Sequence, residues 1–118
     1  MEKFNVSLPI EGDYLTTVRL TTGGLCALAG FDVDTAEDYK VCVTESLLIL
    51  KRNGFSRAEI EFTVGETLGC CVCGIEKNGA PDEALENEIS RALLSALLGD
   101  VKFDVDGQGI VERITFEG

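Results

Sequence analysis

The stretch TAEDYKVCVTESLLILKRNG, residues Thr35–Gly54, decides the fold. Its apolar residues recur at helical spacing, and at 100° per residue they form one broad stripe: Ala36, Tyr39, Cys42, Val43, Leu47, Ile49 and Leu50. Glu45 lies about 40° outside this stripe, beside Ile49 one turn further on. The stretch therefore predicts a long core helix with one carboxylate at the margin of its buried face. That carboxylate is either an ordinary solvated side chain or a functional one, and the residues alone leave both interpretations open.

The composition narrows the class of protein. The 118 residues are 45% hydrophobic and fit one domain, residues 1–118, with one compact core. The net charge of −11 argues against a nucleic-acid surface, because few basic groups are there to neutralise phosphates. No apolar run approaches the roughly 18 residues of a membrane span, and no secretory leader precedes the first expected strand. We therefore expect a cytoplasmic protein that binds neither nucleic acid nor membranes.

The sequence contains five cysteines: Cys26, Cys42, Cys70, Cys71 and Cys73. Most of them lie inside apolar segments, which favours reduced thiols packed as small hydrophobic side chains. The cluster Cys70–Cys73 also suggests a metal or redox site. In a strand, however, Cys71 and Cys73 point to one face and Cys70 to the other, and the sequence has no histidine to complete a zinc site. We therefore expect no metal site.

A strand and a helix precede the long helix. Apolar and polar residues alternate over 3–10, which predicts a strand with one buried face. Asp13 is the expected N-cap of a helix that runs to about residue 29. The apolar face of this helix should hold Tyr14, Val18, Leu25, Leu28 and Ala29.

Two features of these helices need a structural explanation. Gly23 and Gly24 lie inside the first helix, where each should cost about 1 kcal/mol relative to alanine. Either a close approach of another backbone or a bend would explain the pair. The long helix should have Asp34 or Thr35 as its N-cap and should end before Gly54.

The second half of the chain adds a helix and four strands. Alternation over 57–64 and an apolar run over 68–75 predict two strands, and the second should be central because it is apolar on both faces. A third helix should begin near Pro81, with the apolar stripe Leu85, Ile89, Ala92, Leu93 and Ala96. Strands over 101–105 and 110–116 should form a hairpin, with a bulge near Val111 because Glu112 breaks the alternation.

These elements predict a two-layer α/β (α+β) sandwich. Four of the five expected strands have one polar face, so all three helices should pack on the opposite face. The sheet should be mixed and mostly antiparallel, with five strands.

This order resembles the Bergerat (GHKL, histidine-kinase-like) ATPase fold. Two stretches carry the resemblance, Asp13–Ser46 and Arg91–Phe116, and they are similar to small bacterial anti-sigma factors that are also serine kinases. In that family the second helix carries Glu-x-x-x-Asn, whose glutamate is the general base and whose asparagine binds Mg²⁺. The resemblance places Glu45 at the base position and Ile49 at the metal ligand, and an aliphatic side chain offers Mg²⁺ no oxygen.

The other nucleotide contacts of the family are also missing from the sequence. The adenine-binding aspartate has no counterpart in residues 73–79, where Glu76 or Asn78 could substitute only in another register. A short loop stands where the family has a glycine-rich lid. The third helix then begins with Asp82, Glu83, Glu86 and Glu88, where a triphosphate would need donors.

The resemblance implies a regulator that binds a partner protein and has a degenerate ATP site, without kinase activity, cofactor or metal. Glu45 would then be a vestigial general base. Arg19 matches a basic position of the family's partner surface and is the candidate contact for a sigma factor or an anti-anti-sigma domain. The alternative is an ATP-binding serine kinase that phosphorylates an anti-anti-sigma partner. Members of the family commonly form homodimers, so a homodimer is a further expectation.

Overall fold

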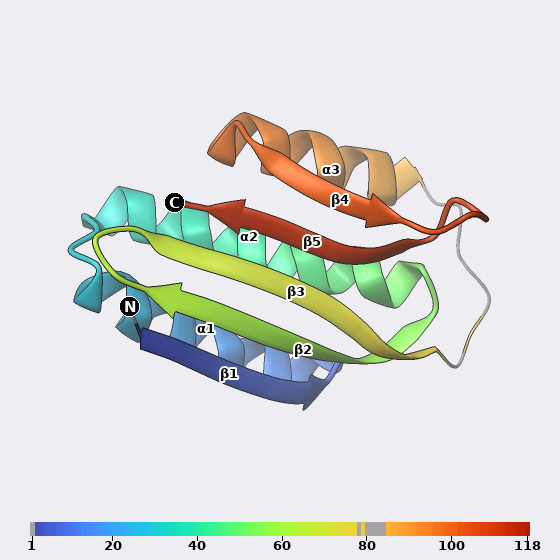
Figure 1. Ribbon diagram of the computed structural model, residues 1–118, viewed down its shortest axis with the longest axis horizontal. Coiled ribbons are helices and arrows are strands. Elements are labelled where there is room, and N and C mark those ends of the chain that lie inside the picture. The colour runs from blue at the N-terminus through green and yellow to red at the C-terminus, as the bar shows by residue number, and fades with distance from the viewer. Residues whose placement is uncertain (1, 78, 80–84) are drawn as a thin grey trace.

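The computed structural model describes residues 2–77, 79 and 85–118, apart from the side chains of residues 85–87. Over these residues the chain forms five strands and three helices (Figure 1). Their order is β1 (Glu2–Pro9), α1 (Gly12–Leu28), α2 (Val33–Arg52), β2 (Phe55–Val64), β3 (Leu68–Lys77), α3 (Leu85–Leu98), β4 (Val101–Val105) and β5 (Val111–Glu117). This is the predicted order of elements. The predicted start of α3 near Pro81 lies outside the described residues.

The strands form one sheet in the order β1-β2-β3-β5-β4. Strand β3 is the central one, as its apolar character on both faces predicted. All four pairings are antiparallel, so the sheet that we expected to be mostly antiparallel is wholly antiparallel. The hairpin β4–β5 contains the predicted irregularity, because Asp104 pairs with Arg113 and Val105 with Val111, which leaves Glu112 without a partner in the register.

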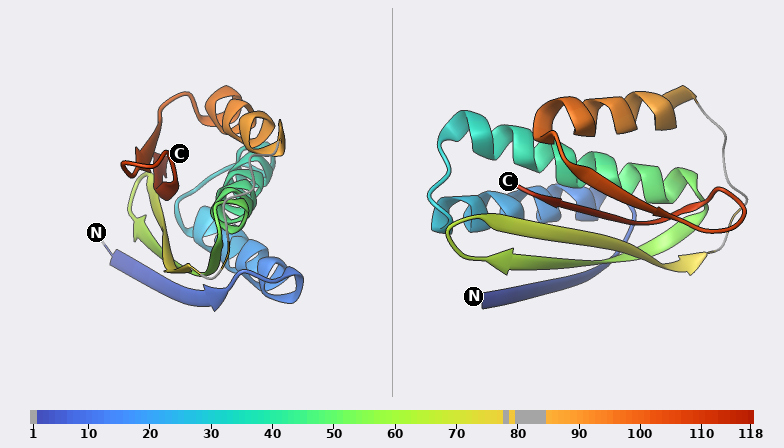
Figure 2. Two further views of the ribbon diagram at one scale, coloured as in Figure 1. Left: turned by 90° about the vertical axis from the view of Figure 1, so that its right-hand side faces the viewer. Right: turned by 45° about the horizontal axis from the view of Figure 1, so that its top comes forward.

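The three described helices all cover one face of the sheet, and none of them lies on the other face (Figure 2). Helix α2 lies between α1 and α3 and packs on β2, β3 and β5. The predicted two-layer α+β sandwich is therefore confirmed. None of the described helices is long and apolar enough to cross a membrane.

The core forms where α2 meets the sheet. The stripe of α2 supplies Tyr39, Leu47 and Ile49, which are almost completely buried. Alternate residues of the central strands face them: Ile60, Phe62, Val72 and Ile114. Period-two alternation in β2 and β3 therefore predicted the buried face of the sheet correctly.

In the two helices that flank α2 our predicted apolar faces are only partly correct. In α1 the prediction is correct for Val18 and Leu25, and Ala29 packs against the core as a partly buried side chain. In α1 the buried residues are Val18, Thr22, Leu25 and Cys26, whereas Tyr14 and Leu28 are exposed. Among the described side chains of α3, Ser90 and Leu94 are buried, whereas Ile89 is 58% exposed and Ala92 and Ala96 are exposed as well. The side chain of Leu85, the first residue of the predicted stripe, lies outside the described part of the chain. The predicted stripe of α3 is therefore wrong, because the helix turns Ser90 toward α2.

The predicted N-caps are also wrong. Helix α1 is capped at Glu11 rather than Asp13, with no side-chain hydrogen bond at the cap. Helix α2 is capped at Asp32, whose carboxylate accepts a 2.7 Å hydrogen bond from the Thr35 amide. Asp34 and Thr35 lie inside the first turn of the helix.

The glycine pair of α1 has two different environments. A Cβ atom on Gly23 would lie 2.8 Å from Cε of Lys40 in α2, whereas one on Gly24 would meet nothing within 4 Å. A side chain of the neighbouring helix, rather than another backbone, therefore explains Gly23.

Candidate functional site

Glu45 lies on α2, on the side that faces α3. The carboxylate is half-buried, and its Oε2 atom accepts a 2.6 Å hydrogen bond from the hydroxyl of Ser90 in α3. The same hydroxyl accepts a 2.9 Å hydrogen bond from Nη1 of Arg52, at the end of α2. Ser90 therefore connects a carboxylate and a guanidinium through one buried hydroxyl.

This arrangement fastens α3 to α2. Ser90 is only 3% exposed, and a buried hydroxyl that donates to one charged group and accepts from another makes two charge-assisted hydrogen bonds. The negative charge of Glu45 also acts on the Cys42 thiol, on the buried side of α2. Burial raises the pKa of the neighbouring Cys42 thiol to about 12, and Asp38 and Glu45 add to the shift. The structure thus gives Glu45 a partner within the chain.

Ile49 occupies the position at which the resemblance has an asparagine. Its side chain is fully buried in the core. Around it, the described residues contain no group of three or more acidic, cysteine or histidine side chains placed to hold a metal ion.

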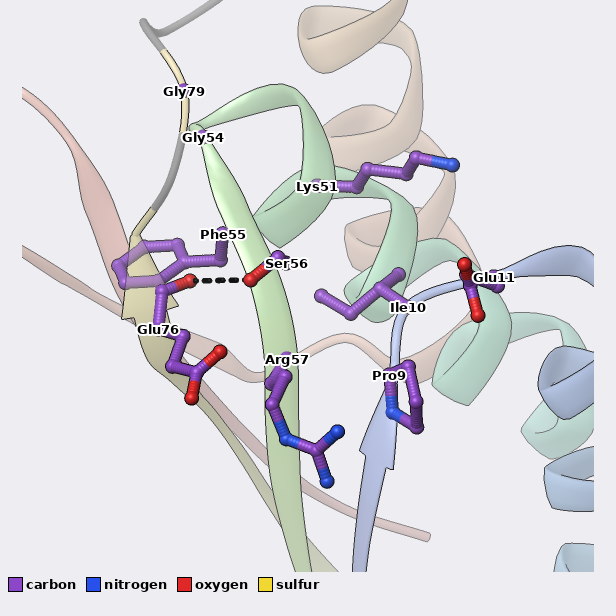
Figure 3. A pocket seen from close by; sticks show the side chains of 10 residues that line it. All are labelled: Pro9, Ile10, Glu11, Lys51, Gly54, Phe55, Ser56, Arg57, Glu76 and Gly79. Carbon is purple, nitrogen blue, oxygen red and sulfur yellow. Dashed lines mark hydrogen bonds between the residues drawn. The ribbon is translucent and has the colours of Figure 1, made fainter.

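The largest cavity that we describe lies at the far end of α2 and has a volume of about 540 Å³ (Figure 3). Gly54 and Gly79 approach each other at one end of it, where the Gly79 amide donates a 3.1 Å hydrogen bond to the Gly54 carbonyl. The lining residues are Pro9, Ile10, Glu11, Lys51, Gly54, Phe55, Ser56, Arg57, Glu76 and Gly79. Neither Glu45 nor Arg19 belongs to this lining.

Glu76 and Asn78 were the two possible substitutes for the adenine-binding aspartate of the family. Glu76 lines the cavity, and its main-chain carbonyl accepts a 3.4 Å hydrogen bond from the Ser56 hydroxyl. Asn78 lies outside the described residues. Two basic side chains, Lys51 and Arg57, and two acidic ones, Glu11 and Glu76, face the cavity together. The described lining residues therefore include equal numbers of basic and acidic side chains.

The carboxylates at the start of α3 are only partly described. Asp82 and Glu83 lie outside the described residues, and so does the side chain of Glu86. Glu88 is exposed.

Arg19 lies on the exposed side of α1, beside a shallow groove of about 220 Å³ between α1 and α2. The groove is lined by Thr16, Arg19, Leu20, Glu37 and Lys40. Glu37 and Lys40 form an ion pair of 2.8 Å, and the Lys40 ammonium lowers the pKa of the Glu37 carboxyl, with a smaller contribution from Arg19. Leu20 is 75% exposed at the same place. Arg19 is thus an accessible cation next to an exposed apolar side chain.

Neither Ser90 nor Arg52 was predicted to lie at the candidate site. Ser90 is the one polar side chain among the described buried residues of α3, so a polar residue inside the buried stripe was the available signal. We assigned that stripe one residue too early, at Ile89, and Ser90 was therefore placed outside the contact with α2.

Known proteins provide an independent comparison. No family model matches the chain. The serine-protein kinase RsbW of Bacillus mycoides is 27% identical over 63 residues, which are 53% of this chain and 39% of that protein. The serine-protein kinase RsbW of Listeria monocytogenes is 29% identical over 58 residues, which are 49% of this chain and 37% of that protein.

The chain is similar to serine-protein kinases named RsbW. The match is weak and covers well under two thirds of the relatives' own length. It agrees with the resemblance that the two sequence stretches indicated, and the α+β fold is consistent with a GHKL-like ATPase.

Proposed function

We propose that this chain is an anti-sigma-like regulator that binds a partner protein and does not transfer phosphate. The observation that carries the proposal is the hydrogen bond between Ser90 and Glu45. A general base must reach the proton that it abstracts. The Glu45 carboxylate instead accepts a hydrogen bond from the buried Ser90 hydroxyl, which itself accepts one from Arg52. Glu45 therefore acts in the packing of α3 on α2.

The burial of Ile49 supports the same proposal. Phosphoryl transfer depends on positioning and charge stabilisation, for which protein kinases use Mg²⁺ ions held by oxygen ligands. The side chain one turn beyond Glu45 is apolar and directed into the core. We accordingly propose that the chain acts without ATP, magnesium or another cofactor.

Titration calorimetry with Mg-ATP tests this part of the proposal. We expect no heat of binding at millimolar nucleotide. A dissociation constant tighter than about 100 μM, about −5.5 kcal/mol, would instead support the second candidate, an ATP-dependent serine kinase that acts on an anti-anti-sigma domain. The similarity of the chain to serine-protein kinases and the matching position of Glu45 favour that candidate.

The proposed partner is a sigma factor or an anti-anti-sigma domain, and the proposed contact is Arg19 with the groove between α1 and α2. Arg19 is an exposed arginine, a residue type that is enriched at the centres of interfaces, and Leu20 adds exposed apolar surface beside it. We would capture partners from the native host with the wild-type chain and with Arg19→Ala. Arg113→Ala, on the opposite face of the molecule, is the matched control.

We expect wild type and Arg113→Ala to retain a sigma factor or an anti-anti-sigma domain, and Arg19→Ala to lose it. If all three proteins retain the partner equally, Arg19 does not contribute to the interface. Recovery of neither class of partner by the wild type would contradict the regulatory function itself. Light scattering of the purified chain tests the homodimer that the resemblance implies.

A further inference from the structure

Two of the five cysteines lie on the face of the sheet that carries no helix. Along β3, buried residues alternate with half-exposed ones, and Cys71 and Cys73 are half-exposed whereas Cys70 is buried. The prediction that most of the cysteines are packed as hydrophobic side chains is therefore correct for Cys26, Cys42 and Cys70.

The two half-exposed thiols touch each other. Their sulfur atoms are 3.8 Å apart. In the neighbouring strand β5, Nε of Arg113 donates a 3.3 Å hydrogen bond to the Cys73 sulfur, and the Thr115 hydroxyl donates a 3.7 Å hydrogen bond to the Cys71 sulfur. Each thiol therefore has its own donor, and the Cys73 sulfur has a cationic one.

The register of the sheet explains why these groups meet. Cys73 pairs with Arg113 of β5 and with Glu59 of β2, and Cys71 pairs with Thr115 and Glu61. Residues directly opposite each other in antiparallel strands lie close enough for their side chains to interact. The dithiol thus lies between a column of carboxylates on β2 and a column of donors on β5.

The thiols of Cys26, Cys42 and Cys70 are buried and are therefore much less reactive. Burial raises the pKa of Cys26 and of Cys42, and it raises that of Cys70 well above its ordinary value. Since the thiolate is the nucleophile, these three groups are inert. Burial also raises the pKa of Cys71, which the Thr115 hydroxyl partly opposes. Cys73, beside the guanidinium of Arg113, is the better nucleophile of the exposed pair.

We propose that Cys71 and Cys73 are a reversible dithiol–disulfide pair that reacts with small-molecule disulfides such as glutathione disulfide. The Cys73 thiolate attacks one sulfur of glutathione disulfide, the S–S bond breaks, and one glutathione thiolate leaves. Cys71, after losing its proton to solvent, then attacks the Cys73 sulfur and expels the second glutathione thiolate. Two cysteines are oxidised, one glutathione disulfide is reduced to two glutathione molecules, and the thiolates take up the protons that the cysteines released.

Strand geometry makes this pair easy to reduce again. Residues two positions apart in a strand have Cα atoms about 6.6 Å apart, near the upper limit of about 6.8 Å for a disulfide. The sulfur atoms must also approach from 3.8 Å to the bonding distance of about 2.05 Å, so β3 has to contract around Val72 when the bond forms. A strained and accessible disulfide is readily reduced, which is the behaviour of a reversible modification.

The test treats the reduced full-length chain with glutathione disulfide and measures the intact mass. We expect the wild type to lose two hydrogens and to carry no glutathione. Cys71→Ser should instead accumulate one glutathione adduct at Cys73, because the resolving thiol is gone. Cys73→Ser should react much more slowly than Cys71→Ser. Cys70→Ala is the control for the third thiol of the cluster and should behave like the wild type, with circular dichroism verifying its fold.

Arg113→Gln tests the donor at Cys73. We expect the first step, measured as adduct formation in the Cys71→Ser background, to slow several-fold. An unchanged rate would contradict the assignment of Arg113. The dithiol itself would be refuted by a wild-type chain that keeps five free thiols, by a disulfide that requires Cys70, or by a disulfide between two copies of the chain.

Discussion

The Ser90 hydroxyl and the Glu45 carboxylate, 45 positions apart in the sequence, form a 2.6 Å hydrogen bond between α3 and α2. Because Arg52 donates to the same hydroxyl, Ser90 is the shared member of two interactions with charged groups. The angle at which α3 lies on α2 therefore depends on a buried polar contact as well as on Leu94.

Replacing Ser90 by alanine should destabilise the fold by about 1.5–3 kcal/mol, because hydrogen bonds to charged groups in a buried contact have this magnitude. Urea denaturation measures the loss. Ser95→Ala, at an exposed position of the same helix, corrects for the higher helix propensity of alanine and should change stability by at most about 0.5 kcal/mol. Equal stability of the two variants would show that the contact contributes nothing.

This contact also shows why the face of α3 could not be predicted. Helix α3 contains leucines at 93, 94, 97 and 98, so local periodicity permits several buried faces. The face is decided by a serine whose partners are in another helix, and a local pattern does not contain that information. In β2, by contrast, a strand has only two faces, and alternation alone placed Ile60 and Phe62 in the core.

The candidate site was predictable to a similar extent. The sequence identified Glu45 as a carboxylate at the margin of the core, and the structure places it there. The sequence could not show that the neighbour of Glu45 is Ser90, because that contact depends on the rotation of α3. The start of α2 was ambiguous for a related reason: Asp32, Asp34 and Thr35 are all good N-caps, and the turn after α1 selects the first of them.

Tyr39 connects α2 to the sheet. Its ring packs edge-on against Phe31 and Phe116, and its hydroxyl, which is almost completely buried, donates a 2.8 Å hydrogen bond to the Leu68 carbonyl. Burial raises the pKa of this hydroxyl far above its ordinary value, so it remains a donor.

Tyr39→Phe should lower the free energy of unfolding by about 1 kcal/mol, because one buried hydrogen bond is lost. The cost should be no larger, because the Leu68 carbonyl keeps a second hydrogen bond, of 3.0 Å, from the Gly118 amide. Urea denaturation compares the variant with Tyr14→Phe, which removes a hydroxyl from a half-exposed ring and should be nearly neutral. A loss of similar size in both variants would contradict the role of the Tyr39 hydroxyl.

Gly54 is required both by its backbone conformation and by its neighbour. Its φ is 97°, and a Cβ atom on it would lie against the carbonyl oxygen of Gly79. Gly30 has a similar φ of 80°, but a Cβ atom there would meet nothing within 4 Å.

Gly30→Ala should therefore lower the free energy of unfolding by only about 1–2 kcal/mol, which is the penalty of placing a residue with a Cβ atom in the left-handed conformation. Gly54→Ala should lower the stability clearly more, because Gly79, two residues beyond the end of β3, must also move away. Thermal unfolding of both variants separates the two effects. If the two melting temperatures fall equally, the contact between Gly54 and Gly79 does not constrain the fold.

The capping carboxylate of α2 gives a prediction about acid stability. The Thr35 amide lowers the pKa of Asp32 from its ordinary value of 3.8, through hydrogen bonding in the folded state. A carboxyl whose pKa is lower when folded stabilises the protein above pH 3.8, and the stabilisation is lost as the pH falls through the folded-state pKa. Asp32→Ala should therefore melt at a lower temperature than the wild type at pH 6, and the difference should shrink as the pH falls below 3.8 through the lower folded-state pKa. Asp34→Ala, which removes a first-turn carboxylate with no capping hydrogen bond, should lower the melting temperature less. A difference between Asp32→Ala and the wild type that stays constant as the pH falls well below 3.8 would mean that the Asp32 cap does not depend on its charge.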